Sequence, residues 1–428
     1  MCEGLNSSVG FFQLYRNKGK QMIHYQSEYY NDILIAINSS RIANKISKIS
    51  YCSLTVKWGS LQESHNGIAH FLEHMLVIFD KKINFKYPYR LLATTAFDRT
   101  TYIILSTQDG LEQSIQMLSL IMNGDFLQNQ YMEEIRKDIL KEYDFKQKSI
   151  ASNMEYSLLY SIAPHIACKI PIGDRESILS LTINDLEREF KSAYMFSNME
   201  ISLSSGIPYD KSISILKEAL LKKNNQLFST SLPKTCHEYQ QRFYPEMLSR
   251  NCAEIYFQLP YINSPSDRII EFICEKVLNS ILSFVSSPDI DARLGIKVFT
   301  RNMRFLNIQL IPRRSTKQIS YSDLKTLLDF IYDELNNIYK SERRYCAYLL
   351  DVKKYIISIQ NDIYRSFKMI EDYFIFEMTT SGISFINNYP KGNQVTILYN
   401  KAIRHLNTMS AFLVYYDQEH NIICQNAE

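Results

Sequence analysis

Hydrophobic and polar positions in the first half of the chain follow two different periods. A period of two, or a short apolar run, predicts strands at residues 33–37, 50–58, 101–107 and 199–205. A period near 3.6 predicts helices at about residues 67–79, 111–122, 131–147 and 182–194, and a short one ending at 223. This half therefore mixes strands with helical hairpins.

The second half repeats this order. Strands are predicted at residues 253–259 and 305–311, and helices at about 266–284, 321–340 and 341–376. A polar stretch at 223–241 separates the halves, which gives two domains, 1–225 and 240–428. The similar order indicates an internal duplication, although no residue-level repeat is visible. We expect an α+β fold with two homologous domains, each a mixed or antiparallel sheet packed with helices, rather than a doubly wound sheet.

Composition narrows the possible functions. With 48 Lys and Arg against 45 Asp and Glu, the net charge is +3 and the basic doublets are scattered, so no nucleic-acid partner is expected. The 12 glycines include no adjacent pair and form no phosphate-binding loop. No segment approaches the ~18 consecutive apolar residues of a membrane span. Eight cysteines without a Cys-x-x-Cys pair, and a start unlike a signal peptide, favour reduced thiols and a cytoplasmic location.

The most informative motif lies in the helix predicted at 67–79. His70 and His74 are four residues apart, so both side chains lie on one helical face and can bind one Zn²⁺. Glu73 comes directly before the second histidine, where it can take a proton from a water molecule at the metal without binding the metal itself. This is the His-x-x-Glu-His motif, the reverse of the commoner zinc-peptidase order. A solvated polar helix face is the alternative interpretation.

A catalytic zinc ion needs a third protein ligand and an open position. In the helix at 131–147, Glu133 and Glu134 lie in the first turn, where acidic residues are common and easily solvated. Glu142 instead shares the apolar face with Ile135 and Ile139, so its carboxylate needs a partner. A metal ion and a buried ion pair both satisfy that need.

These residues resemble a known family. The segment Gly59-Ser60-(x)2-Glu63-(x)3-Gly67-Ile-Ala-His70-Phe-Leu-Glu73-His74-Met75 is similar to the signature of the pitrilysin family. That family includes insulysin, mitochondrial processing peptidase and many bacterial peptidases. Further segments agree in order from about residue 48 to 205, and the chain has the size of a short, two-domain bacterial-type member.

The resemblance implies an α+β fold whose two homologous domains form half of a clamshell chamber. It assigns His70, His74 and Glu142 as ligands of one Zn²⁺ per chain and Glu73 as the general base. The chain departs from the family in a shorter loop after His74 and in Ile135, which replaces a second glutamate. The substrate-side strand reads Thr95-Ala96-Phe97-Asp98, where the family usually has Asn-Ala-aromatic-Thr.

We therefore expect a zinc metalloendopeptidase that cleaves peptides or a precursor or leader peptide. The substrate would add as an extended strand at the sheet edge near Thr95, Ala96 and Phe97. Two alternatives stay open: a catalytically inactive assembly subunit of the same fold, and a zinc hydrolase of a non-peptide substrate.

The resemblance also bears on partners. The family's substrate clamp is an arginine followed seven residues later by a tyrosine, and these places fall on Asp291 and Val298 here. Arg293 and Phe299 could partly replace the pair. We expect a heterodimer with a related subunit that lacks the zinc motif, and a homodimer as the second choice.

Overall fold

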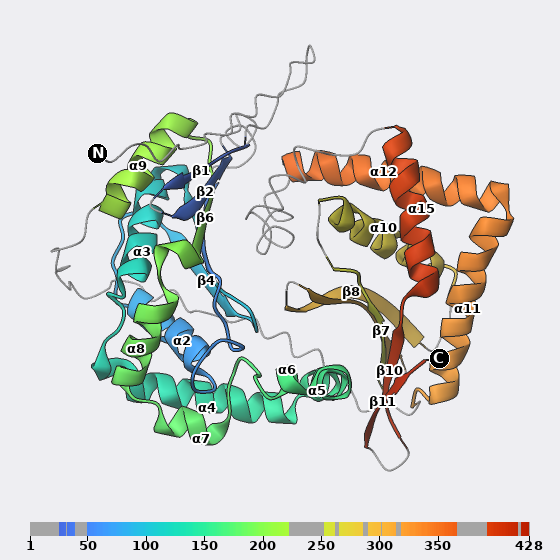
Figure 1. Ribbon diagram of the computed structural model, residues 1–428, viewed down its shortest axis with the longest axis horizontal. Coiled ribbons are helices and arrows are strands. Elements are labelled where there is room, and N and C mark those ends of the chain that lie inside the picture. The colour runs from blue at the N-terminus through green and yellow to red at the C-terminus, as the bar shows by residue number, and fades with distance from the viewer. Residues whose placement is uncertain are drawn as a thin grey trace, which may run out of the picture. The chain divides into compact units, whose positions relative to one another are not determined.

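The computed structural model describes residues 25–30, 32–38, 49–221, 252–261, 265–285, 290–300, 302–313, 318–365, 392–417 and 421–427. The polar stretch at 223–241 and the predicted helix end at 366–376 lie outside these ranges. The chain divides into two compact units (Figure 1). The first comprises 1–141, 169–238 and 361–387, and the second comprises 142–168, 239–360 and 388–428. The α+β class is confirmed, with one sheet in each unit.

The first unit contains a six-stranded sheet in the order β1-β2-β6-β3-β5-β4. Its strands are β1 (Tyr25–Tyr30), β2 (Ile33–Asn38), β3 (Ile49–Val56), β4 (Tyr89–Thr95), β5 (Thr100–Thr107) and β6 (Met199–Ser204). All pairs are antiparallel except β2 with β6, which is parallel. The sheet is therefore mixed, and β4 is an outer strand.

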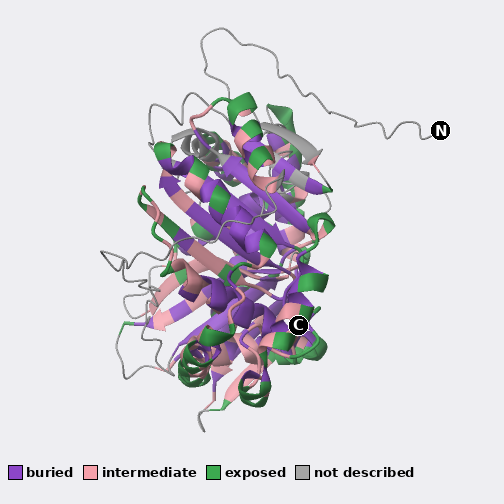
Figure 2. Cartoon of the chain, turned by 90° about the vertical axis from the view of Figure 1, so that its left-hand side faces the viewer, coloured by how far each residue is buried: buried purple, intermediate pink, exposed green. Residues whose placement is uncertain are grey.

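The first unit also contains six helices among its described residues, and those that pack on the sheet do so through an apolar face. The six are α2 (Ile68–Asp80), α3 (Leu111–Asn123), α4 (Met132–Lys148), α7 (Arg175–Ser180), α8 (Ile183–Ala193) and α9 (Tyr209–Leu221). Helix α3 packs on β3 and β5, and α2 packs on β4. Figure 2 shows buried positions in purple alternating with exposed positions in green along the helices. The division between the units falls within the single helix α4, between Lys141 and Glu142.

The second unit contains an antiparallel five-stranded sheet in the order β11-β10-β7-β9-β8. Its strands are β7 (Ala253–Gln258), β8 (Ile290–Thr300), β9 (Met303–Pro312), β10 (Ala411–Tyr416) and β11 (Ile422–Asn426). Its helices are α5 (Ile150–Ile162), α6 (Pro164–Ala167), α10 (Pro265–Leu282), α11 (Tyr321–Lys340), α12 (Glu342–Arg365) and α15 (Asn393–Thr408). Helices α10 and α15 pack together, and α5 contacts β10 and β11.

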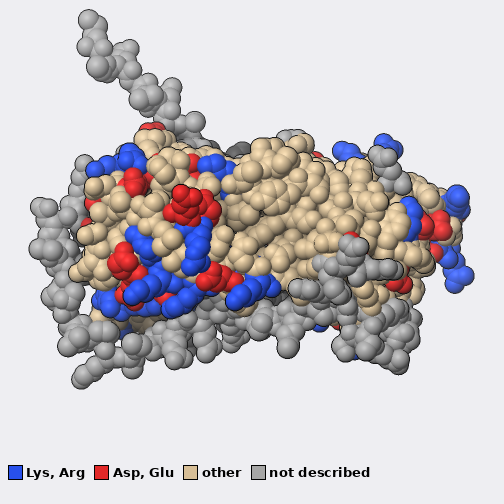
Figure 3. Space-filling view, turned by 90° about the horizontal axis from the view of Figure 1, so that it is seen from below, with Lys and Arg blue, Asp and Glu red and all other residues tan. Residues whose placement is uncertain are grey.

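Charged side chains on the surface of the first unit lie close to opposite charges. Figure 3 shows Lys and Arg interspersed with Asp and Glu. The pairs Lys141–Asp138 and Arg188–Asp185 join atoms 3.2 and 2.8 Å apart. Among the described helices, none combines the length and the apolarity needed to cross a lipid bilayer.

Candidate metal centre

Helix α2 presents the three motif residues at positions that are largely shielded from solvent. His70 and Glu73 are 6% and 7% exposed, and His74 is half-buried. The rings of His70 and His74 meet edge to face, with centroids 4.5 Å apart. The alternative of a solvated helix face is therefore wrong for His70 and Glu73.

Helix α4 supplies the third residue of the cluster. Ligand atoms of His70, His74 and Glu142 all lie within 4.8 Å of one another. Glu142 is buried, whereas Glu133 and Glu134 are exposed. The structure thus brings together the three residues expected as ligands and leaves the two first-turn glutamates in solvent.

The donor chemistry of this cluster fits a zinc ion. Two imidazole nitrogens and one carboxylate oxygen form the usual protein ligand set of a catalytic zinc with one open position. Glu142 also has a second contact, because the ammonium nitrogen of Lys146 lies 2.9 Å from Oε1 of Glu142. The sequence allowed either a metal ion or an ion pair as the partner of Glu142. The structure has residues arranged for both.

A buried carboxylate holds the start of helix α2. Oε1 of Glu63 accepts a hydrogen bond from the N–H of Gly67 at 2.6 Å, and Oε2 accepts one from the N–H of Ala69 at 2.9 Å. Two of the backbone donors that a helix N-terminus leaves unpaired are thereby satisfied. Burial nevertheless raises the pKa of Glu63 to about 8, against the opposing effect of the two N–H donors and Lys169. The sequence contained Glu63 within the signature but did not reveal this role.

The loop that precedes α2 is fixed to the turn between β4 and β5 by backbone hydrogen bonds. The N–H groups of Ser60 and Leu61 donate to the carbonyls of Ala96 and Phe97 at 3.2 and 2.8 Å. A Cβ on Gly59 would lie 2.3 Å from the carbonyl oxygen of Ala96, so only glycine permits this approach. The loop and the turn therefore hold the motif helix at a set position relative to the outer strand β4.

This geometry bears on the three residues expected to bind substrate. Phe97 is 6% exposed, and the carbonyls of Ala96 and Phe97 already accept hydrogen bonds from the loop. Thr95 is the last residue of β4 and is half-buried. Its hydroxyl donates a hydrogen bond of 2.6 Å to Oε2 of Glu73. Sequence reasoning missed this contact, since nothing in the local pattern reports a bond between a strand end and a helix.

Two buried tyrosines lie near Glu73. The hydroxyls of Tyr102 on β5 and Tyr194 at the end of α8 are 2.5 Å apart. Burial raises the pKa of both hydroxyls, and the negative charge of Glu73 adds to the effect. Both therefore stay neutral, so the surroundings of Glu73 on this side contribute dipoles rather than charge.

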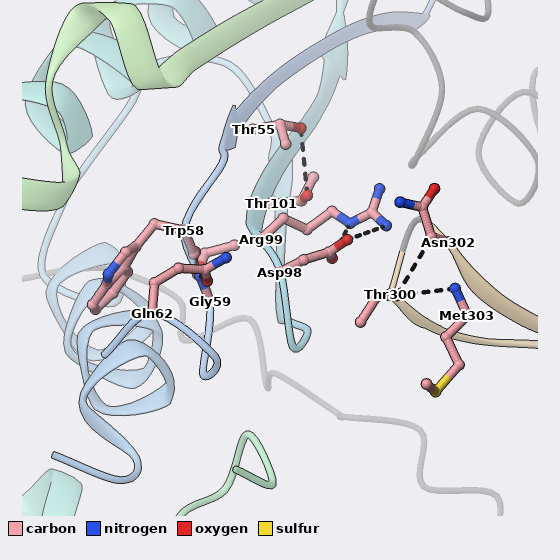
Figure 4. Close-up of polar contacts among 11 residues, drawn as sticks. Thr55, Trp58, Gly59, Gln62, Asp98, Arg99, Thr101, Thr300, Asn302 and Met303 are labelled. Atoms are coloured by element: carbon pink, nitrogen blue, oxygen red, sulfur yellow. Dashed lines mark hydrogen bonds and ion pairs between the residues drawn. The ribbon is translucent and has the colours of Figure 1, made fainter. Parts of the chain in front are cut away.

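In the second unit, strand β8 carries the residues considered for a substrate clamp. Arg293 lies 3.3 Å from a carboxylate oxygen of Asp291 and is half exposed. Phe299 is only 2% exposed and packs edge to face on Phe305. At the end of this strand, the hydroxyl oxygen of Thr300 accepts the N–H groups of the next turn (Figure 4). Phe299 therefore belongs to the core of its unit.

A family model, Insulinase (Peptidase family M16), matches residues 41–164. The matched segment contains His70, Glu73, His74 and Glu142. The chain carries an M16 peptidase domain. The resemblance drawn from the motif is thus confirmed.

Curated relatives of this M16 domain agree with the family. The mitochondrial-processing peptidase subunit beta of Dictyostelium discoideum is 24% identical over 198 residues, 42% of each chain. The human subunit of the same name is 24% identical over 194 residues, 41% of this chain and 39% of that one. The chain spans less than half the length of the curated relatives it matches.

Solved structures share the fold. A protease from Helicobacter pylori superposes with a TM-score of 0.61 at 13% identity, covering 91% of this chain and 98% of that one. Pitrilysin superposes with a TM-score of 0.60 at 13% identity, covering 96% of this chain and 47% of that one. The fold of the M16 proteases therefore extends over most of the chain.

Proposed function

We propose that this M16-family chain is a zinc-dependent endopeptidase. The observation that carries the proposal is the convergence of His70, His74 and Glu142, with ligand atoms within 4.8 Å of one another. These three residues would hold one Zn²⁺ per chain, and Glu73, which lies outside the cluster of ligand atoms, would act as the general base.

Each residue has a distinct part in peptide hydrolysis. Bound zinc supplies Lewis-acid chemistry, which polarises the scissile carbonyl and makes water more acidic. Glu73 takes a proton from the attacking water on a carboxylate oxygen and later gives it to the leaving amine. Thr95 donates a hydrogen bond to Oε2 of that carboxylate, and the two tyrosines near Glu73, Tyr102 and Tyr194, stay neutral.

The substrate would be a peptide in extended conformation. Strand β4 is one of the two outer strands of its sheet, so a peptide can add beside it through backbone hydrogen bonds. We propose that this edge, ending at Thr95, Ala96 and Phe97, places the scissile bond near the cluster. Recognition through the backbone gives modest sequence preference, as a precursor or leader peptidase requires.

We further propose that the homologous domains 1–225 and 240–428 form half of a closed chamber. A related subunit without the zinc motif would complete it, with a homodimer as the second choice. In support, curated relatives are named as one subunit, beta, of a processing peptidase. The cytoplasmic location stays a prediction, and one structural neighbour is described as the periplasmic protease PqqL from Escherichia coli.

One observation favours a second candidate, an inactive assembly subunit of the same fold. The ammonium of Lys146 gives Oε1 of Glu142 an ionic partner that is not a metal. A zinc hydrolase of non-peptide substrates has no comparable support.

The deciding experiment compares the parent chain with Glu73→Gln. Zinc content is measured by mass spectrometry, and cleavage is measured on a panel of fluorogenic peptides. We expect both proteins to hold zinc and only the parent to cleave, because the variant keeps the ligands and loses the base. A metal-free parent supports the assembly subunit, and equal cleavage by both proteins removes Glu73 as the base.

A further inference from the structure

The contact between strand β4 and helix α2 concerns a residue outside the His-x-x-Glu-His motif. Oγ1 of Thr95 lies 2.6 Å from Oε2 of Glu73 and 3.5 Å from the carbonyl oxygen of Ala69. A hydroxyl has a single proton to donate, and the shorter contact has the length of about 2.5–2.7 Å typical of a hydroxyl bonded to a carboxylate. The hydroxyl of Thr95 therefore donates to Glu73.

Thr95 is itself rigidly placed. It pairs with Thr100 at the end of the β4–β5 ladder, and the next residue is bonded in both directions. The N–H of Ala96 donates to the carbonyl of Arg99 at 2.8 Å, and the carbonyl of Ala96 accepts from Ser60. A β-branched side chain has few χ1 choices, so the position of the backbone sets the position of the hydroxyl.

Glu73, by contrast, has a flexible side chain. A glutamate on a helix has three rotatable bonds, and a general base acts only within hydrogen-bond reach of the proton that it takes. The Thr95 hydroxyl engages one carboxylate oxygen and so restricts rotation of the carboxyl group. By the resemblance, the family usually has an asparagine where Thr95 stands, so the hydroxyl departs from the usual residue.

We propose that Thr95 is a positioning residue that orients the carboxylate of Glu73 through its hydroxyl. This inference rests on the proposed peptidase function. In this arrangement the side chain of Thr95 bonds to the general base, and the substrate pairs only with the backbone of β4. Because β4 is also the strand beside which a peptide would add, one residue links the register of the substrate strand to the orientation of the base.

The test compares Thr95→Val, which keeps the shape and removes the donor, with Thr95→Ser, which keeps the donor. The matched control is Thr326→Val, the same substitution at an exposed position of helix α11 in the second unit. With zinc-loaded protein we expect Thr95→Val to lower kcat by about 10- to 100-fold with KM within about twofold, since full general-base catalysis contributes about 10²- to 10⁴-fold. Thr95→Ser should recover most of the rate, and Thr326→Val should match the parent.

A second readout needs neither metal nor turnover. The infrared difference between a metal-free protein and its Glu73→Gln derivative isolates the carboxyl band of Glu73. We expect this band to shift when Thr95 becomes valine and to stay in place in Thr95→Ser and in Thr326→Val. If Thr95→Val fails to fold by circular dichroism, Thr95→Ala against Thr95→Ser makes the same comparison.

Several outcomes overturn the proposal. A raised KM with kcat unchanged makes the side chain of Thr95 a substrate contact, and parent-like kinetics with an unshifted band removes it from the site. A parent that cleaves no peptide removes the proposed function alone. In that case the infrared comparison still decides whether Thr95 holds Glu73, because an unshifted band refutes the contact and a shifted band supports it.

Discussion

At the scale of single residues, the main question is whether the carboxylate of Glu142 binds a metal ion or pairs with a lysine. This carboxylate lies in the His70–His74 cluster and also 2.9 Å from the ammonium of Lys146. Removing water from a carboxylate is costly, so one of these partners must compensate for it. The lysine is 29% exposed and can turn to solvent, whereas the histidines are fixed on α2. A divalent ion would therefore compete well for the carboxylate.

Because Glu142 lies in this cluster, we expect its replacement in Glu142→Ala to weaken zinc binding. We expect the variant to lose most of its zinc, with affinity reduced by roughly 10²-fold or more, because even the loss of an outer partner of a ligand costs about 10- to 100-fold. Chelator competition gives the affinity. Glu133→Ala and Glu134→Ala are the controls, since both glutamates are exposed on the same helix. Equal zinc affinity in all three variants would leave Glu142 with its ion pair alone.

The sequence located some of these residues and not others, for a physical reason. His70, Glu73 and His74 are spaced by helix geometry within five residues, so a local pattern reveals them. Glu142 was indicated only by a carboxylate on an apolar helix face. Thr95 contacts Glu73 across a separation of 22 residues, and its position depends on how the β4–β5 turn meets the preceding loop. The local pattern of hydrophobic and polar residues does not predict this contact between the turn and the loop.

At the scale of elements, the same limit explains which strands were predicted. Strands β2, β3, β5, β6, β7 and β9 were predicted within about two residues because their patterns of burial are strong. The outer strands β4 and β8 were missed, since their residues are mostly half-buried on both faces and show no clear alternation. Strands β1, β10 and β11 were not predicted either. Helix α5 was also missed, as only Met154, Leu158 and Leu159 are buried in it.

Gly59 tests how tightly the loop before α2 is joined to the β4–β5 turn. Gly59→Ala places a methyl group 2.3 Å from the carbonyl oxygen of Ala96 and 2.6 Å from the N–H of Arg99. Both neighbours are backbone atoms, so we expect a loss of about 2–3 kcal/mol in the free energy of unfolding. Gly295→Ala is the control, because nothing lies within 4 Å of its added Cβ. Equal denaturation midpoints would show that the loop yields at little cost.

Glu63, which caps helix α2, should make the stability of the chain depend on pH. Its pKa is raised to about 8 in the folded chain from an ordinary value of 4.5, mainly by burial. The folded state therefore binds more protons than the unfolded state between these values. Stability contributed by the protonated group is complete below about pH 4.5 and is lost as pH rises through about 8. Lys169 opposes the shift and Glu189 adds to it.

The measurement is urea denaturation of the metal-free protein at pH 5 and pH 8. We expect the parent to lose more stability than Glu63→Gln over this interval, by up to a few kcal/mol, because one pKa unit corresponds to about 1.4 kcal/mol. Glu133→Gln, an exposed glutamate on α4, should behave as the parent does. Identical pH dependence of the parent and Glu63→Gln would mean that the two N–H donors keep Glu63 ionised throughout.

At the scale of the whole molecule, two halves with similar element order were predictable from periodicity, and the structure has one sheet in each unit. The sheets are not identical in type, since the first contains the parallel pair β2–β6 and the described strands of the second are all antiparallel. The assignment of 142–168 to the second unit was beyond sequence reasoning, because it depends on packing of α5 against β10 and β11.

The substrate clamp leads to the prediction about a partner. The resemblance expects an arginine and, seven residues later, a tyrosine, at places occupied here by Asp291 and Val298. Of the nearby residues, Phe299 is buried on Phe305, and the half-exposed Arg293 lies 3.3 Å from a carboxylate oxygen of Asp291, so we expect that they do not recreate the pair. A homodimer would then contain two zinc sites and no clamp.

We therefore expect the purified chain to bind zinc and yet cleave peptides slowly. Mixing it with a related two-domain chain that lacks His-x-x-Glu-His but keeps the arginine and tyrosine should raise kcat/KM by at least about 10-fold, since remote contacts with substrate are what orient it for reaction. Light scattering should show a 1:1 complex. The control is Glu73→Gln in the present chain, which should form the same complex and remain inactive, because the partner brings the clamp and this chain brings the base. Full activity of the chain alone, as a monomer or a homodimer, would refute the heterodimer hypothesis. The residues of strand β8 would then be sufficient for binding substrate.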